Sequence, residues 1–108
     1  MPKSFAINYK YVADFYYLRI SYHYAHIKHF KALESRNKFY LFGGTEFPYN
    51  SSNIFVHGFE ESKDVEDFVK EDPFVKKGLV TNYFIEEIEP IGKKSIEEVA
   101  KYYTYLCK

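Results

Sequence analysis

The chain has 108 residues, the size of one ordinary domain with a core of its own. Fifteen Lys and Arg residues balance fifteen Asp and Glu residues, which argues against a strongly basic nucleic-acid-binding protein. The longest strongly apolar stretch, Phe39–Phe42, is far shorter than the roughly 18 residues of a membrane helix, and the single Cys107 cannot close an internal disulfide. We therefore expect a cytoplasmic domain with no membrane partner.

Aromatic residues are abundant, with 12 Tyr and 11 Phe. Aromatic side chains can pack against ligands or stack on bases. However, Lys, Tyr, Phe, Asn and Ile share A/T-rich codons, so a biased genome explains the same composition. Lys76–Lys77 and Lys93–Lys94 are short pairs rather than a basic stripe, so no nucleic-acid partner is expected.

The first half of the chain predicts a strand, a long helix and a second strand. Residues Phe5–Tyr11 alternate along the chain, which indicates a strand. No Gly or Pro interrupts Tyr16–Arg36, and Asp14 precedes this stretch as an N-cap, so one long helix is expected. Lys38–Gly44 is typical of a strand that ends in a glycine pair. At helical spacing, the apolar face of the long helix comprises Tyr16, Ile20, His23, Ile27 and Phe30.

The next segment predicts a loop followed by a third strand. Pro, Asn and Ser residues within Phe47–Ser52 indicate the loop, and Asn53–Phe59 is the expected strand. Because side chains alternate along a strand, Ile54 and Val56 should face one side of the sheet. Phe55 and Phe59 should face the other side.

A short helix and a fourth strand complete this part of the chain. Ser62 is expected to cap the helix, which should stop at Asp72 because Pro73 disfavours helical geometry in the preceding residue. Phe74–Gly78 is a connector, and Val80–Ile88 is the fourth strand.

A last helix is expected over Ser95–Leu106, where Ser95 and Glu98 form a capping box. The elements before it follow the order β-α-β-β-α-β, which predicts an α+β fold of the ferredoxin-like kind. We therefore expect a ferredoxin-like domain over residues 1–91 and a C-terminal helical extension over residues 92–108.

The expected sheet carries apolar residues on both faces. Its two helices cover one face, and the second face also needs cover. A homodimer that packs sheet against sheet would supply it, and so would the C-terminal helix.

Three of the four histidines, His23, His26 and His29, fall within the long helix. Steps of three residues turn successive side chains by about 60°, so the three fan out instead of converging on one metal ion. Cys107 is a poor fourth ligand, and no metal or other cofactor is expected. His29 should be a solvated helix residue, and His57 a strand residue near a turn.

His26 lies at the border of the apolar helix face, about 40° from Phe30. A half-buried imidazole needs a hydrogen-bond partner, and a satisfied structural histidine is the simplest interpretation. Asp72 has an equally simple interpretation as a helix-stop residue. If the two side chains met, the carboxylate would fix the tautomer of the imidazole, and the other ring nitrogen could take a proton.

Three blocks of the sequence resemble the YCII-related (YciI-like) family of small proteins. The first is Arg19–Ile27, which ends in Ala-His-Ile where the family has Ala-His-Leu on its first helix. The second is Phe39–Gly44, at the end of a strand. The third and most specific, Phe68–Val80, contains an Asp-Pro-aromatic-Val run followed by Gly-Leu. Together the blocks span most of the chain, from about Phe5 to Pro90.

The resemblance implies a dimeric α+β barrel made of two ferredoxin-like protomers with facing sheets. It also implies that His26 and Asp72 form an active-site pair, and related members of that fold catalyse lactone isomerisation or dehydrohalogenation of small ring compounds. Two positions depart from the family pattern. Gly43 is followed by Gly instead of Pro, and His23 stands where an arginine is frequent, a role that Arg19 could take over.

We therefore expect a small enzyme that uses His26 and Asp72 for acid/base chemistry on a small organic molecule, by proton transfer, isomerisation or elimination. One alternative is a non-catalytic ligand-binding or regulatory homodimer on the same scaffold. Another is an interaction module that presents its C-terminal helix to a partner. The expected substrate-binding residues are Arg19, Tyr22, His23, Phe42, Gly43 and Phe74.

Overall fold

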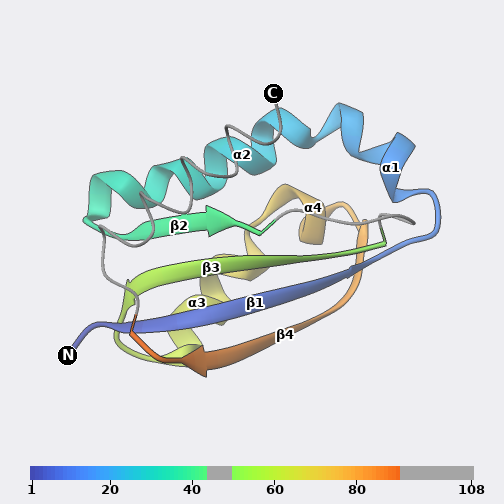
Figure 1. Cartoon of the computed structure of the whole chain (residues 1–108). Coiled ribbons are helices and arrows are strands. Elements are labelled where there is room, and N and C mark those ends of the chain that lie inside the picture. The colour runs from blue at the N-terminus through green and yellow to red at the C-terminus, as the bar shows by residue number, and fades with distance from the viewer. Residues whose placement is uncertain (44–49, 91–108) are drawn as a thin grey trace.

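The computed structural model describes residues 1–43 and 50–90, which form a four-stranded sheet with helices packed on one face (Figure 1). The strands lie in the order β2-β3-β1-β4, and each neighbouring pair is antiparallel. This arrangement confirms the ferredoxin-like α+β fold. The strands are β1 (Lys3–Tyr11), β2 (Phe39–Phe42), β3 (Ser51–Phe59) and β4 (Val80–Ile88).

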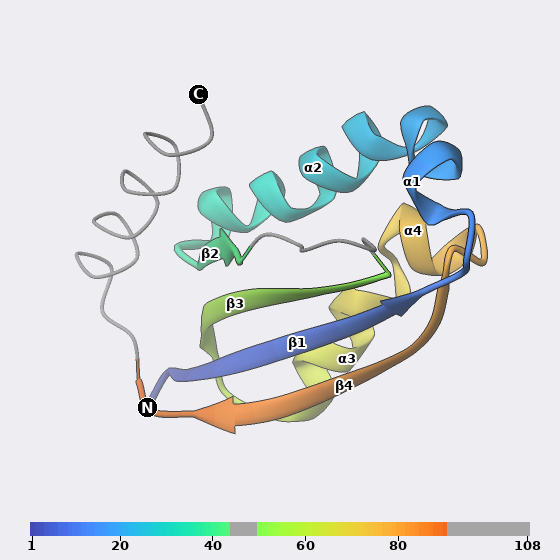
Figure 2. The same ribbon diagram turned by 45° about the vertical axis from the view of Figure 1, so that its right-hand side comes forward.

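The helices fall into two groups, one before β2 and one before β4. Figure 2 shows the first group beside β2 and the second behind β3, β1 and β4. The first group is α1 (Phe15–Leu18), the 3-10 turn η1 (Arg19–Ser21), α2 (His23–Lys31) and the 3-10 turn η2 (Ala32–Arg36). The second group is α3 (Ser62–Lys70) and α4 (Pro73–Lys76). No helix in the described ranges is long and apolar enough to cross a membrane.

The core lies between the helices and one face of the sheet. The alternation predicted for β1 is confirmed for the core cluster, which contains Phe5, Ile7 and Tyr9 and not Ala6, although Ala6 is itself only 8% exposed. Register places Phe5 opposite Val56 and Ile7 opposite Ile54, so the two central strands present one continuous apolar surface to the helices.

The single long helix predicted before β2 is wrong in two respects. It is divided into α1, η1, α2 and η2, and its inward face is offset by about one residue from the predicted stripe. This stretch is aromatic on every side, so periodicity alone could not select the buried face. Helix α1 does begin after Asp14, although the Asp14 side chain forms no capping hydrogen bond. The residues that turn inward are Phe15, Tyr22, His26, Phe30 and Leu33, whereas Tyr16 and Ile20 are exposed.

The predicted orientation of Phe59 is also wrong. Its side chain is 4% exposed and belongs to the core, on the same face as Ile54 and Val56. Gly58 adopts φ 111°, and the β1–β3 register shifts between Lys3 and Ser4. This irregularity breaks the alternation, so the last residue of β3 points to the other face.

Several predicted boundaries shift by a few residues. Ser62 is the first residue of α3 rather than its cap, which is Glu61, and α3 ends at Lys70. The connector predicted after Pro73 contains helix α4, and β3 begins at Ser51 inside the predicted loop. The rest of that loop at 44–49 and the predicted helix Ser95–Leu106 lie outside the described residues.

Candidate active site

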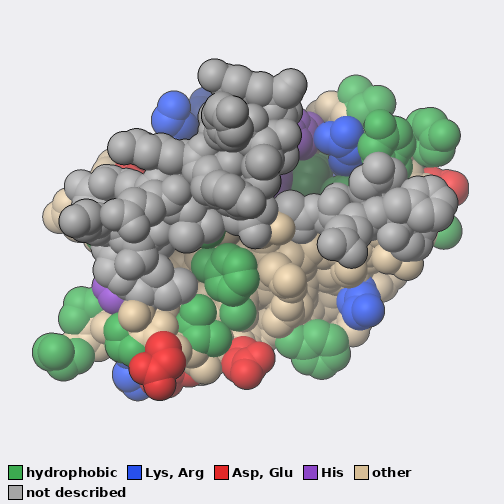
Figure 3. Space-filling model, viewed as in Figure 1, with side chains coloured by type: hydrophobic (Ala, Val, Ile, Leu, Met, Phe, Trp, Pro, Cys, Tyr) green, Lys and Arg blue, Asp and Glu red, His purple; other side chains and the backbone are tan. Residues whose placement is uncertain are grey.

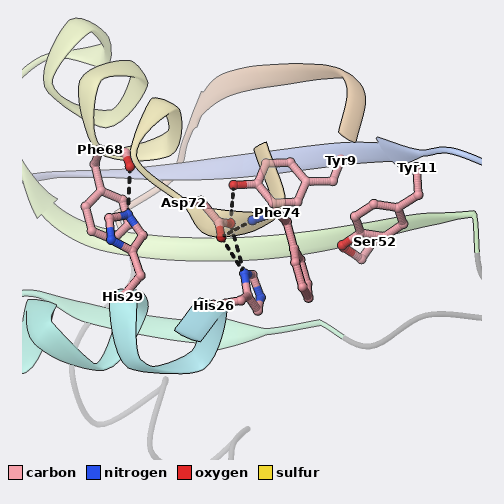
Figure 4. A network of polar contacts seen from close by, with 8 residues as sticks. All are labelled: Tyr9, Tyr11, His26, His29, Ser52, Phe68, Asp72 and Phe74. Carbon is pink, nitrogen blue, oxygen red and sulfur yellow. Dashed lines mark hydrogen bonds and ion pairs between the residues drawn. The ribbon is translucent and has the colours of Figure 1, made fainter. Parts of the chain in front are cut away.

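His26 and Asp72, which are 46 positions apart in the sequence, meet in the space between α2 and the start of α4 (Figure 4). His26 Nδ1 lies 2.9 Å from Asp72 Oδ1 and 2.9 Å from Oδ2. His26 is 5% exposed and Asp72 is fully buried. An ionised carboxylate can accept hydrogen bonds but cannot donate them. His26 Nδ1 therefore carries the ring proton and donates a hydrogen bond to Asp72.

The backbone around Asp72 explains why the carboxylate is held in place. Asp72 is extended, with φ −63° and ψ 127°, as expected before Pro73. It caps α4, and its Oδ1 accepts a hydrogen bond of 3.1 Å from the Phe74 backbone N–H. Asp72, two residues after the end of α3, therefore caps α4 and also contacts His26.

Tyr9 is a further member of this network that the sequence did not single out. Its hydroxyl, from the core face of β1, donates a hydrogen bond of 2.8 Å to Asp72 Oδ2. Burial, followed by the charge of Asp72, raises the pKa of Tyr9 far above its ordinary value, so the hydroxyl keeps its proton and remains a donor. A tyrosine predicted to be in the core needs a partner for its hydroxyl, which is the signal that could have identified it.

The second ring nitrogen of His26, Nε2, has no hydrogen-bond partner among the side chains of residues 1–43 and 50–90. No completely buried side-chain nitrogen or oxygen in these ranges lacks a partner, so Nε2 keeps some exposed surface. With Nδ1 protonated, Nε2 carries the lone pair of the neutral imidazole.

Aromatic rings enclose the imidazole. Phe74 stacks on it with ring centroids 4.0 Å apart and an angle of 11°, and Phe42 and Phe30 lie at 5.3 and 5.2 Å. Figure 3 shows a recess below the α2 helix, with hydrophobic side chains in its depth and His and Lys or Arg side chains at its border. The ring is thus held on one side by a carboxylate and on others by apolar surfaces.

The other predicted site residues lie around this pair at different distances. Phe42 and Phe74 contact His26 directly, as described above. Tyr22 is half-buried one turn before His26, and the Lys77 ammonium lies 6.0 Å from its ring centroid. The guanidinium of Arg19 lies over Tyr16 instead, 5.0 Å from its ring centroid.

His23 and Gly43 stand at the edge of this region. Partial burial, then the charges of Arg19 and His26, lower the pKa of His23, which favours its neutral form. The Gly43 N–H donates to the Asn53 carbonyl at 2.7 Å, and a Cβ atom on Gly43 would lie 2.9 Å from that oxygen. Gly43 therefore permits a close approach of two backbones directly after Phe42.

Within the part of the chain that the structure describes, the four histidines are not grouped with enough other metal-ligating side chains to form a metal centre. No group of three His, Cys, Asp or Glu side chains in the described ranges is arranged to hold a metal ion. His57 Nδ1 is hydrogen-bonded to the Ser4 hydroxyl at 2.7 Å. His29, predicted to be solvated, is instead half-buried against Phe68.

Comparison with known proteins supports the class that the fold defines. The chain is similar to a solved structure of the dimeric α+β barrel superfamily, which supports that superfamily for this fold. Within that class, the chain is similar to 5-chloro-2-hydroxyhydroquinone dehydrochlorinase (TftG) from Burkholderia phenoliruptrix AC1100, solved in complex with 2,5-dihydroxybenzoquinone. The TM-score is 0.59 with 25% sequence identity, and the match covers 84% of this chain and 97% of that chain. No protein-family model and no curated protein matches the chain.

Proposed function

We propose that this protein is an acid/base enzyme in which His26 transfers a proton to or from a small organic molecule. The observation that carries the proposal is the bond from His26 Nδ1 to both oxygens of a fully buried carboxylate, with Nε2 left accessible. A carboxylate on one ring nitrogen fixes the tautomer and stabilises the imidazolium that forms when the other nitrogen takes a proton.

In the proposed reaction, Nε2 takes a proton from the substrate and Asp72 stabilises the charged ring. If the proton returns to a different atom, the result is isomerisation. If the electron pair of the broken C–H bond forms a double bond and a leaving group departs with its own bonding pair, the result is elimination. Asp72 and Tyr9 are positioning residues in either case, because their contacts are with the imidazole and with each other.

We propose a small cyclic, hydroxylated substrate. The structural neighbour TftG is a dehydrochlorinase bound to 2,5-dihydroxybenzoquinone, a planar ring. The rings of Phe42 and Phe74 around His26 suit a planar molecule, because aromatic faces favour offset or edge contacts with other rings. Substrate contacts from Arg19, Tyr22, His23 and Gly43 are part of the same proposal.

We also propose membership of the YciI-like family, with a family domain over residues 1–91 and an extension over 92–108. The homodimer expected from that family would form through the open face of the sheet. In support, Phe84 of β4 on that face is 59% exposed, and Phe55 and Leu41, which are paired across β3 and β2, are partly exposed. An apolar sheet face of this kind commonly marks an interface.

The experiment is a turnover assay on a panel of chlorinated and unsubstituted hydroxyquinols and small lactones, followed by absorbance and by chloride release. With any compound that is turned over, His26→Gln should lower kcat by about 10²–10⁴-fold, the usual contribution of a general base. His29→Gln is the matched control, since it removes a second imidazole from the same helix, and it should change kcat by no more than about threefold.

Nitrogen NMR of the imidazoles supplies a readout that needs no substrate. In the wild type, the neutral His26 ring should carry its proton on Nδ1. In Asp72→Asn the amide can donate to that nitrogen, so the proton should move to Nε2. An unchanged tautomer in the variant would contradict the proposed pair, and a compound that binds at His26 without turnover would favour a non-catalytic receptor.

A further inference from the structure

We propose that this protein has a second ligand site, separate from His26 and Asp72, for a small apolar zwitterion such as a dipeptide or an apolar amino acid. The site is a cavity of about 520 Å³ between α3 and the segment that joins η2 to β2. Figure 4 shows His29 and Phe68, which line this cavity, to one side of the His26–Asp72 pair. The volume lies in the range of small-molecule sites.

The cavity carries opposite charges on different secondary-structure elements. Arg36 and Lys38 come from the segment between η2 and β2, whereas Asp64 and Asp67 come from one face of α3. None of these four side chains forms an ion pair with a residue of the described ranges. Two cations and two carboxylates therefore line the cavity without an ion-pair partner among the described residues.

Two further carboxylates at the cavity are already engaged. Glu60 pairs with the N-terminal ammonium at 3.3 Å, and Glu71 pairs with the Lys76 ammonium at 3.2 Å. The charges left for a ligand are thus two of each sign. A purely cationic ligand would leave Arg36 and Lys38 without partners, and a purely anionic one would do the same to Asp64 and Asp67.

The apolar part of the cavity is aromatic and rigidly held. Phe59 and Phe68 are 4% and 8% exposed, and their ring centroids are 6.0 Å apart. The Lys38 ammonium lies 5.2 Å from the centroid of the Phe59 ring. His29 stacks on Phe68 and donates through Nε2 to the Phe68 carbonyl at 2.8 Å, which fixes this wall.

These features together define the ligand class. An ammonium group would pair with Asp64 or Asp67, and a carboxylate with Arg36 or Lys38. An apolar side chain would contact the small parts of Phe59 and Phe68 that line the cavity. A dipeptide has both charges separated by several bonds, which suits cations and carboxylates that come from different elements.

The inference is independent of the proposed function, because neither His26 nor Asp72 lines the cavity. The experiment is a titration of the isotope-labelled full chain with L-leucyl-L-phenylalanine and with L-phenylalanine, followed by NMR. We expect saturable shifts for residues at Phe59 and Phe68 and at the His29 ring. His26→Gln should bind the same ligands with unchanged affinity, whether or not it abolishes turnover.

Two kinds of control make the test sharp. N-acetylated and C-amidated forms of the same dipeptide lack one charge each and should bind at least about tenfold more weakly, about 1.4 kcal/mol. Asp67→Asn and Arg36→Gln should each weaken binding of the uncapped dipeptide by a similar factor. Asp14→Asn and Lys31→Gln, exposed substitutions away from the cavity, should leave the affinity unchanged.

Three results would overturn the proposal. The first is the absence of saturable shifts up to about 10 mM of either ligand, a concentration well above the dissociation constant of a specific complex. The second is equal binding of the capped and uncapped dipeptides, which would show that the terminal charges of the dipeptide do not contribute to binding. The third is a set of shifts centred on His26 instead of His29, which would place the ligand in the other site.

Discussion

His26 and His29 are three residues apart on the same helix, and each stacks on a phenylalanine. The ring centroids are 4.0 Å apart for His26 and Phe74 and 4.1 Å apart for His29 and Phe68. The two imidazoles differ in their hydrogen-bond partner. His26 meets the carboxylate of Asp72, whereas His29 meets the backbone carbonyl of Phe68.

The difference shows that the partner, rather than the residue type or its helix, decides what an imidazole can do. A carboxylate can stabilise a full positive charge on the ring, while a carbonyl mainly fixes the orientation of one N–H. Both partners are far away in sequence, because Phe68 lies near the end of α3 and Asp72 lies between α3 and α4. The hydrogen-bonding of the two imidazoles of α2 is therefore set by residues at the end of α3 and at the start of α4.

The largest expected effect comes from removing the carboxylate. Asp72→Ala should lower the free energy of unfolding by about 3–5 kcal/mol, because it leaves His26 without its buried partner and removes the cap of α4. Tyr9 would also lose its acceptor. Urea denaturation followed by circular dichroism measures the change.

Asp67→Ala is the matched control for this substitution. Asp67 is an exposed aspartate of α3 that forms no ion pair with the described residues, so its loss should change stability by no more than about 0.5 kcal/mol. Equal effects at the two positions would show that the contacts of Asp72 contribute nothing beyond those of a surface carboxylate.

A smaller effect is expected at alkaline pH from Tyr11, the neighbour of Tyr9 on the same face of β1. Burial raises the pKa of Tyr11 to about 12, despite the opposing hydrogen bond with the Ser52 hydroxyl. The unfolded chain loses this proton near pH 10, about two units earlier, so stability must fall as the pH rises between the two values.

Comparison of Tyr11→Phe with the wild type isolates this contribution. Between about pH 9 and about pH 11.5, the wild type should lose about 2 kcal/mol more stability than the variant, as measured by urea unfolding at both pH values. The hydrogen bond to Ser52 is absent from the variant at both pH values and largely cancels. Parallel loss of stability in the two proteins would contradict the assignment.

Tyr9→Phe tests the hydrogen bond from the Tyr9 hydroxyl to the Asp72 carboxylate, and a smaller effect on stability is expected. The substitution keeps the ring and removes one buried hydrogen bond, so stability should fall by about 1–1.5 kcal/mol. The His26 proton should remain on Nδ1, since Asp72 still faces it. A drop in kcat without a change of tautomer would identify Tyr9 as a positioning residue, whereas unchanged stability and kcat would exclude that role.

The fold was largely predictable from sequence, because alternation in β1 and the proline after Asp72 are local signals. The pairing of His26 with Asp72 was predicted only through the family resemblance, since no local pattern links residues 46 positions apart. Tyr9 was missed for the same reason. The predicted orientation of Phe59 was wrong because an irregularity at Gly58 reverses the alternation of side chains along β3. The predicted buried face of the helix before β2 was wrong because this segment carries apolar residues on all its sides.

The smallest expected effect belongs to His29, and it returns to the contrast between the two imidazoles. His29→Gln removes the stacking on Phe68 but leaves an amide that can still donate to the Phe68 carbonyl, so the loss should be about 0.5–1 kcal/mol. The corresponding His26→Gln places an amide beside a carboxylate that also holds Tyr9 and the Phe74 N–H, and its loss should be about twice as large. Thermal unfolding of the two variants gives the ratio directly. If His29→Gln were the more destabilising of the two, the contact of His29 with the Phe68 carbonyl would contribute more to stability than the contact of His26 with Asp72. That result would contradict the larger contribution expected of the carboxylate.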